Sequence, residues 1–195
     1  MIYMKVKFTK EEARRIEFEM SGFQLYFANA VRRFAMSRVP TMAIDSVTVY
    51  ENSSSSFDEY IANRLGLIPL KAPLGYAPKA GFSLLSLDKT GPVSVYSSDI
   101  KSLDPKVKMA IPNIPLLKLL EHQNIRLEAK ALSGIGLKHA KFQPCLAAYD
   151  EKGPESFSFF VESFSQLPAR TILHEAAGIL LEKSKELEKA LSELK

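Results

Sequence analysis

The chain has 195 residues, of which 46% are hydrophobic and 25% are charged, and its formal net charge is +4. These proportions are typical of a soluble globular protein and exclude a disordered, fibrous or collagen-like chain. The length allows one full domain or two small ones. No apolar run reaches the ~18 residues of a membrane-spanning helix, and the start lacks the apolar segment of a secretory signal. The use of a single cysteine fits a reducing compartment, and we expect a cytoplasmic protein.

The residues that carry most metal and nucleophile chemistry are few and scattered. Cys145 is the only cysteine, which excludes an internal disulfide and any zinc or iron–sulfur site built from several cysteines. The three histidines, His122, His139 and His174, lie apart without the spacing of a ligand cluster. We predict no catalytic or metal site, and a small enzyme that uses Cys145 or His139 stays open as an alternative.

Hydrophobic periodicity predicts an N-terminal hairpin followed by a helix. Residues 3–8 and 15–20 alternate like paired strands. From 23 to 36 the apolar residues recur at helical spacing. Arg32 and Arg33 lie side by side on this helix and point away from its apolar stripe. Paired arginines suit bidentate recognition of carboxylates or backbone carbonyls on a partner, with a solvated helix face as the alternative.

A strand and a short helix follow in the chain. Residues 41–50 alternate as a strand, with Asp45 on the apolar face and no evident partner for it. The pattern from Ser56 to Glu59 is that of a capping box, and the apolar residues after it predict a helix over 57–65. Gly66 then stands where a helix commonly ends.

The middle of the chain reads as short strands and turns. Residues 82–109 alternate weakly, and 116–122 are expected to form one or two helical turns. Residues 125–132 and 157–164 alternate clearly as strands. Between them, we expect residues 133–136 to form a glycine loop. The G-x-G that they contain is too short a motif to predict a phosphate-binding site.

The last segment predicts one long helix with a narrow apolar seam. From Pro168 to the end there is no further proline, and leucines recur every seven residues. The seam comprises Leu173, Leu180, Leu187 and Leu194, with Ala177, Ser184 and Leu191 between them. Such a narrow stripe suits a single partner helix. A helix of this length spans about 40 Å, so we expect part of it to pack on another chain.

Three motifs within residues 29–70 carry a family resemblance. They are NAVRR at 29–33, VPTMAID at 39–45 and DEYIANRLGLIPL at 58–70. Their combination resembles the D subunits of archaeal RNA polymerase, which correspond to the bacterial alpha N-terminal domain and the third-largest eukaryotic subunit. Weaker similarity continues through residues 125–144 and 159–163.

The resemblance implies an α+β fold and a scaffold role. It implies an alpha-subunit-like, discontinuous dimerisation domain (1–45 plus 156–195) with a long C-terminal helix. A mostly-β domain (46–155) is inserted into it. Members of this family act as non-catalytic assembly subunits of DNA-directed RNA polymerase, whose active site lies on other subunits. The expected partners are the smaller alpha-like subunit L, the small subunits N and P, and the second-largest catalytic subunit.

The resemblance also implies two sets of interface residues. The candidates for contact with the second-largest subunit are Asn29, Arg32, Arg33, Asp58, Glu59, Asn63 and Arg64. The candidates for contact with subunit L are Leu173, Ala177, Leu180, Leu187, Leu191 and Leu194. The second set coincides with the leucine seam that the periodicity predicts independently.

One segment departs from the family pattern. Many D subunits carry a cysteine-rich insertion with an iron–sulfur cluster after the segment that corresponds to 139–144. Here that place holds only residues 145–156 with one cysteine, so we predict no cluster and no other cofactor.

A second functional class remains as an alternative. The chain could be a free-standing basic regulator that binds nucleic acid through Arg14 and Arg15, Arg32 and Arg33, and residues 138–141.

Overall fold

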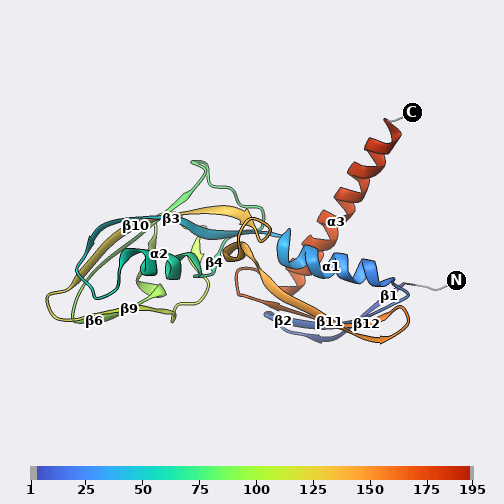
Figure 1. Cartoon of the computed structure of the whole chain (residues 1–195), viewed down its shortest axis with the longest axis horizontal. Helices are drawn as coiled ribbons and strands as arrows, with labels where there is room; N and C mark the ends of the chain where they lie inside the picture. Colours follow the sequence, from blue (N-terminus) through green and yellow to red (C-terminus); the bar gives the residue numbers. More distant parts are fainter. Residues whose placement is uncertain (1–3, 194–195) are drawn as a thin grey trace. The chain divides into compact units, whose positions relative to one another are not determined.

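The computed structural model describes residues Met4–Glu193 (Figure 1) and divides the chain into two compact units. The first unit consists of Met1–Val39, Ile135–Leu137 and Gln143–Lys195, and the second of Pro40–Gly134 and Lys138–Phe142. The described residues form strands together with three α-helices, one of them long and C-terminal. The predicted α+β class is confirmed.

The first unit is built on a four-stranded antiparallel sheet with the order β1-β2-β12-β11. Its strands are β1 (Lys5–Glu11), β2 (Arg15–Ser21), β11 (Cys145–Gly153) and β12 (Ser156–Ser163). Apolar and charged residues alternate along β2, so that Ile16, Phe18 and Met20 are buried on one face. Phe18 lies opposite Phe159 in the register, and their rings stack with 5.1 Å between centroids. This aromatic pair joins the two central strands.

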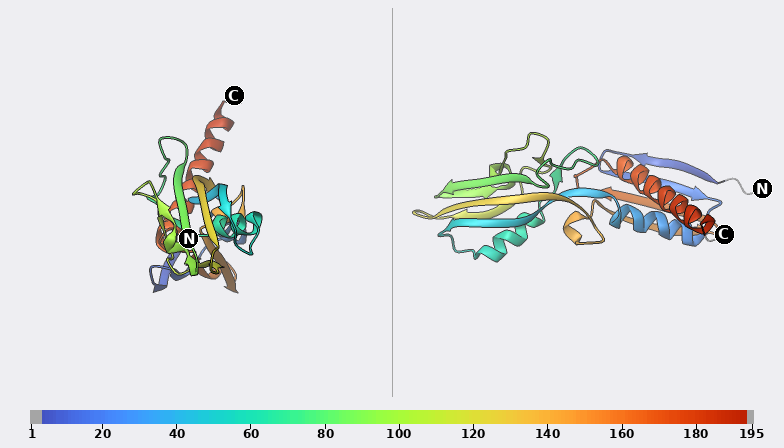
Figure 2. Two further views of the ribbon diagram at one scale, coloured as in Figure 1. Left: turned by 90° about the vertical axis from the view of Figure 1, so that its left-hand side faces the viewer. Right: turned by 90° about the horizontal axis from the view of Figure 1, so that it is seen from above.

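Two helices pack on this sheet and beside one another, α1 (Leu25–Ser37) and α3 (Ala169–Ser192) (Figures 1 and 2). Helix α1 buries the small residues Ala28 and Ala35, which allow it to approach the sheet closely. Phe27 is one of the apolar residues that recur at helical spacing along this helix, but its side chain is 37% exposed.

The second unit contains a six-stranded sheet with the order β7-β5-β10-β3-β4-β8 and a two-stranded sheet of β6 and β9. The strands are β3 (Pro40–Asn52), β4 (Leu70–Lys71), β5 (Ser83–Thr90), β6 (Val93–Tyr96), β7 (Lys101–Ser102), β8 (Lys108–Met109), β9 (Pro115–Leu119) and β10 (Asn124–Ile135). Helix α2 (Asp58–Gly66) contributes Ile61 and Leu65 to the core. The short 3-10 turns η1 (Ser97–Asp99) and η2 (Ala140–Phe142) complete the chain order.

Three local expectations differ from the structure. Residues 115–119 form strand β9 rather than a helical turn, because they pair with β6 and bury Leu116 and Leu119 on that sheet. Strand β11 was not predicted, since its sequence lacks regular alternation. The capping box does not form: Phe57 is the N-cap, and the Asn52 amide instead donates to the Asp58 carboxylate (2.7 Å).

The chain passes from one unit to the other after Val39, Gly134, Leu137 and Phe142, whereas the family resemblance implies domain boundaries after residues 45 and 155. Strand β3 belongs to the second unit from its first residue because it pairs with β4 and neighbours β10. Strand β11 belongs to the first unit because it pairs with β12 along its whole length.

Candidate functional site

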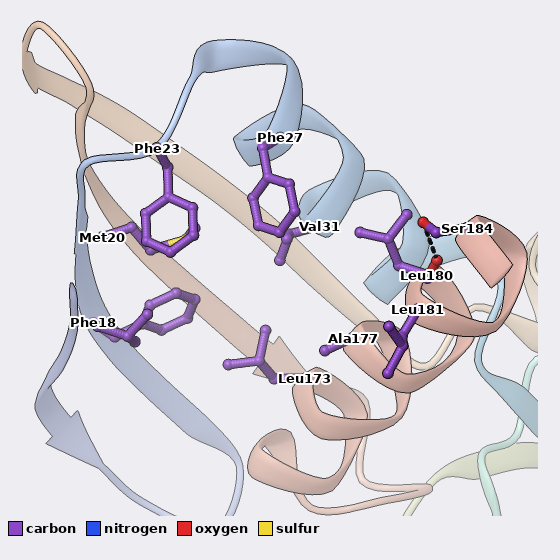
Figure 3. A pocket seen from close by; sticks show the side chains of 11 residues that line it. Phe18, Met20, Phe23, Phe27, Val31, Leu173, Ala177, Leu180, Leu181 and Ser184 are labelled. Atoms are coloured by element: carbon purple, nitrogen blue, oxygen red, sulfur yellow. Dashed lines mark hydrogen bonds between the residues drawn. The ribbon is translucent and has the colours of Figure 1, made fainter. Parts of the chain in front are cut away.

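An open apolar groove lies in the first unit between β2, α1 and α3, and we call it the apolar groove. Its volume is about 410 Å³. Side chains from the three elements point into it (Figure 3). The lining residues are Val6, Phe18, Met20, Phe23, Phe27, Val31, Leu173, Ala177, Leu180, Leu181 and Ser184.

The groove offers hydrophobic contact and almost no polar group. Val6 is 50% exposed, Phe27 37% and Leu181 56%, although each belongs to the residue types that folding normally buries. Ser184 is the one polar residue of the lining, and its hydroxyl donates to the Leu180 carbonyl oxygen at 2.9 Å (Figure 3). Because that hydrogen bond lies within the helix, the groove can bind an apolar partner without leaving the serine unsatisfied.

The predicted seam of α3 lies beside the face that packs on the sheet. Ala169, Ile172 and Ala176 are the buried residues of this helix. One position further along, Leu173 packs at the edge of the core, and Ala177 joins it in the groove lining. Leu180 also lines the groove, as the seam requires.

The outer half of α3 carries the rest of the seam into solvent. Leu187 is 61% exposed and Leu191 56%. Leu194, the last predicted seam residue, lies outside the described residues. The structure therefore places three of the six predicted residues in or beside the apolar groove and two on the exposed continuation of the same helix.

A second groove runs along α1, and we call it the arginine groove. It has a volume of about 660 Å³ and collects the predicted residues Asn29, Arg32 and Arg33. The remaining lining residues are Tyr26, Ala30, Phe34, Ser37, Arg38 and Leu137. The Arg32 guanidinium donates to the Asn29 side-chain oxygen at 3.5 Å, a long contact that leaves most of its donors available.

The predicted residues of α2 lie in the second unit and have different surroundings. Glu59 and Asn63 are exposed, and Asn63 lines a small pocket that also contains the ion pair of Lys141 with Asp45 (2.8 Å). Arg64 is half-buried and donates to the Pro115 carbonyl oxygen and to the Tyr60 hydroxyl (3.3 Å). Arg64 thus holds α2 to β9, a role within the chain that the sequence did not suggest.

Several surface residues escaped the sequence analysis. Tyr26, Arg38 and Leu137 complete the arginine groove, and Phe57 and Tyr60 form an exposed aromatic pair at the start of α2 with 5.9 Å between ring centroids. A signal existed for Phe57, which is the first apolar residue of the helix that the sequence predicts over 57–65. The sequence carried no signal for Leu137, because its place beside α1 depends on a contact between distant segments. The Leu137 N–H donates a hydrogen bond to the Ser37 carbonyl oxygen (3.0 Å).

Cys145 and His139, the candidate residues of the alternative enzyme hypothesis, both make contacts within the chain. Burial raises the pKa of the Cys145 thiol to about 12, and its sulfur contacts the Ala35 carbonyl oxygen at 3.5 Å. His139 accepts a hydrogen bond from the Lys141 N–H at 3.1 Å. Between Met4 and Glu193 no three His, Cys, Asp or Glu residues come together as a metal site would require. None of the helices in this range is both long and apolar enough to cross a membrane.

Comparison with protein families decides the relationship. Residues 17–184 match the RNA polymerase Rpb3/Rpb11 dimerisation domain. The chain belongs to this family. The match includes β2, α1 and the inner part of α3, which are the elements that form the apolar groove.

Curated relatives agree with the family match. The chain is 49% identical to DNA-directed RNA polymerase subunit Rpo3 of Methanocaldococcus jannaschii over 159 residues, or 81% of each chain. It is 43% identical to Rpo3 of Pyrococcus horikoshii over 152 residues, and 37% identical to Rpo3 of Methanothermobacter thermautotrophicus over 158. These alignments cover 59% and 60% of the two relatives, so the chain spans about three fifths of their length. The predicted resemblance to archaeal D subunits is confirmed, and the matches do not favour a free-standing nucleic-acid-binding regulator.

Proposed function

We propose that the chain is a non-catalytic assembly subunit of a cytoplasmic DNA-directed RNA polymerase. It pairs through the apolar groove with the smaller alpha-like subunit L. The observation that carries this proposal is the groove itself, which exposes Val6, Phe27 and Leu181 next to a helix that continues past the sheet. Contiguous exposed apolar surface of this kind marks an interaction site.

The form of the groove favours a helical partner. Leu173, Ala177 and Leu180 follow one another at helical spacing on one wall, and Phe27 and Val31 do so on the other. A helix laid between the two walls would contact both sets at once, as in other helix-in-groove complexes. The exposed Leu187 and Leu191 extend the same seam and would add contacts to that helix or to its neighbour.

The other predicted interface residues support a second role in assembly. We propose that Asn29, Arg32 and Arg33 of α1, together with Asp58, Glu59 and Asn63 of α2, contact the second-largest subunit. Arg64 contributes by fixing the position of α2. The small subunits N and P complete the platform on which the catalytic subunits assemble.

We further propose that the chain holds no catalytic site and no iron–sulfur cluster. Such clusters are held mostly by four cysteine thiolates, and the residues present do not fit one, since Cys145 is alone and buried. In the place of the family's insertion, β11 and β12 pair directly up to Gly153 and Ser156. Iron and sulfide analysis of the purified complex should find neither, and stoichiometric iron would contradict this part of the proposal.

Affinity purification of the tagged chain from cells that contain the whole polymerase tests the assembly role. The wild-type chain should co-purify with subunit L, with the second-largest subunit and with promoter-independent RNA synthesis activity. Arg32→Ala should retain subunit L and lose much of the second-largest subunit. Loss of subunit L from this variant would contradict the division of the two interfaces.

A further inference from the structure

We infer that the arginine groove of α1 binds an acidic, carboxylate-bearing segment of the second-largest subunit, and that Arg38, Tyr26 and Leu137 belong to this contact. The inference rests on the proposed function for the identity of the partner. It adds the chemistry of the bound segment and three residues that neither the motifs nor the family match assign.

The groove concentrates positive charge without any compensating carboxylate. Arg32, Arg33 and Arg38 all line it, and no aspartate or glutamate does. Throughout Met4–Glu193, none of these three guanidinium groups lies within 4.0 Å of a carboxylate oxygen. By contrast, Arg15 on the same unit pairs with Glu17 (2.9 Å) and Glu162 (3.2 Å).

Contacts within the chain do not account for this cluster. The Arg38 guanidinium lies 5.8 Å from the centroid of the Phe34 ring, and Arg32 makes one long hydrogen bond to Asn29. The dipole of α1 favours a cation at its C-terminus, and this effect is small at an exposed site. That effect applies to Arg38 at the C-cap and falls off before Arg32 and Arg33.

Guanidinium groups specify the chemistry of the partner. Each presents donors in a planar fork that matches a carboxylate, and such charge-assisted pairs are among the stronger hydrogen bonds in proteins. With a volume of about 660 Å³, the groove has room for several side chains of a bound segment. A stretch with two or three aspartates or glutamates would match the charge of the arginines.

The groove favours a protein segment over nucleic acid. Tyr26 is 75% exposed and Leu137 60%, so apolar surface lies beside the arginines. Tyrosine and arginine together are the residue types enriched at protein interfaces. The lining mixes the arginines with Tyr26, Phe34 and Leu137 and contains no lysine, whereas a nucleic-acid footprint is a patch or stripe made mainly of lysine and arginine.

Binding of the purified chain–L pair to the second-largest subunit, measured over a range of salt concentrations, tests the inference. Arg33→Glu and Arg38→Glu should each weaken binding at least about tenfold at low salt. Arg38→Lys should lose less, because it keeps the charge. Arg126→Glu is the matched control, since it reverses an exposed arginine on the second unit and should bind like wild type.

Competition identifies the chemistry of the occupant. Polyglutamate should displace the second-largest subunit from the wild-type pair, and a single-stranded oligonucleotide of equal charge should not. Displacement by the oligonucleotide alone would overturn the inference in favour of nucleic acid.

The outcomes separate this inference from the proposed function. If both glutamate variants bind as tightly as wild type, the acidic segment is refuted while the assembly role stands. If the wild-type pair does not bind the second-largest subunit at any salt concentration, the assignment of the partner itself is refuted.

Discussion

The ring of Phe27 stacks on the ring of Phe23 with 5.2 Å between their centroids, yet the two residues differ in burial. Phe23 is 9% exposed and belongs to the core, whereas Phe27 is 37% exposed and forms part of the wall of the apolar groove. The core of the first unit thus continues outward into a surface that the chain does not cover by itself.

Phe27→Ala should therefore affect pairing more than folding. Truncation of a fully buried phenylalanine costs about 3–5 kcal/mol of stability, and the partly exposed Phe27 should cost clearly less. Loss of its ring from the interface should weaken pairing with subunit L at least about tenfold. Phe159→Ala, which removes a buried ring, should reduce the stability of the chain more than it weakens pairing. Titration calorimetry for pairing and urea unfolding for stability separate the two effects.

Leu187→Asp tests the outer part of the α3 seam. Leu187 is 61% exposed in the chain, so the charge should leave its fold intact. If a partner helix covers this position, pairing would bury the unpaired carboxylate at a cost of about 3–5 kcal/mol. Pairing should therefore be lost. Leu146→Asp is the control, because Leu146 is 47% exposed on β11 and lines neither groove. Equal pairing of both variants, assayed by size-exclusion chromatography, would show that the seam is not part of the interface.

Two glycines predict opposite effects of the same substitution. A Cβ at Gly136 would lie 2.4 Å from the Met36 carbonyl oxygen, so Gly136→Ala should destabilise the chain by about 1–3 kcal/mol. A Cβ at Gly178 on α3 would meet nothing within 4 Å. Gly178→Ala should therefore stabilise the chain by up to about 1 kcal/mol through helix propensity. Urea unfolding of the chain measures both, and shifts of the same sign would contradict the packing described.

Asp104 should make the second unit sensitive to acid. Its carboxylate accepts hydrogen bonds from the Tyr76 hydroxyl (2.6 Å), the Lys106 N–H (3.0 Å) and the Ser83 hydroxyl (2.9 Å), and these lower its pKa. Because the folded state prefers the charged form, this stabilisation is present above the ordinary aspartate pKa of about 4 and is lost as the pH falls below it. The melting temperature of the wild-type chain should therefore decrease as the pH falls below about 4. Asp104→Asn should make the melting temperature depend less on pH there. An unchanged pH profile for the variant would exclude this role.

Cys145 should be inert in the folded protein. Burial raises the pKa of its thiol to about 12, so almost no thiolate is present at neutral pH. A thiol reagent such as 5,5′-dithiobis(2-nitrobenzoate) should label the native chain very slowly and label one thiol rapidly in urea. Rapid labelling of the native protein would contradict the burial of this residue and reopen a nucleophilic role.

The long helix and its seam could be predicted from sequence because a seven-residue repeat is a local signal. The sequence could not tell which apolar face packs on the chain's own sheet. Ile172 and Ala176 lie next to Leu173 and Ala177, and both pairs are apolar. Only the sheet, which forms from strands at the two ends of the chain, decides that the first pair is buried and the second borders the groove.

The arginine groove was predictable only in part. The NAVRR motif placed Asn29, Arg32 and Arg33 on one helix, and the structure keeps them together. Leu137 and strand β11 depend on contacts between distant segments, which no local pattern encodes. The same holds for Arg64, whose hydrogen bond to Pro115 depends on how α2 packs against β9.

The mass of the complex formed on co-expression with subunit L tests the central claim most directly. Light scattering after size-exclusion chromatography should give one species whose mass is the sum of this 21.8 kDa chain and one copy of subunit L. A stable 21.8 kDa monomer that elutes apart from folded subunit L would contradict the account.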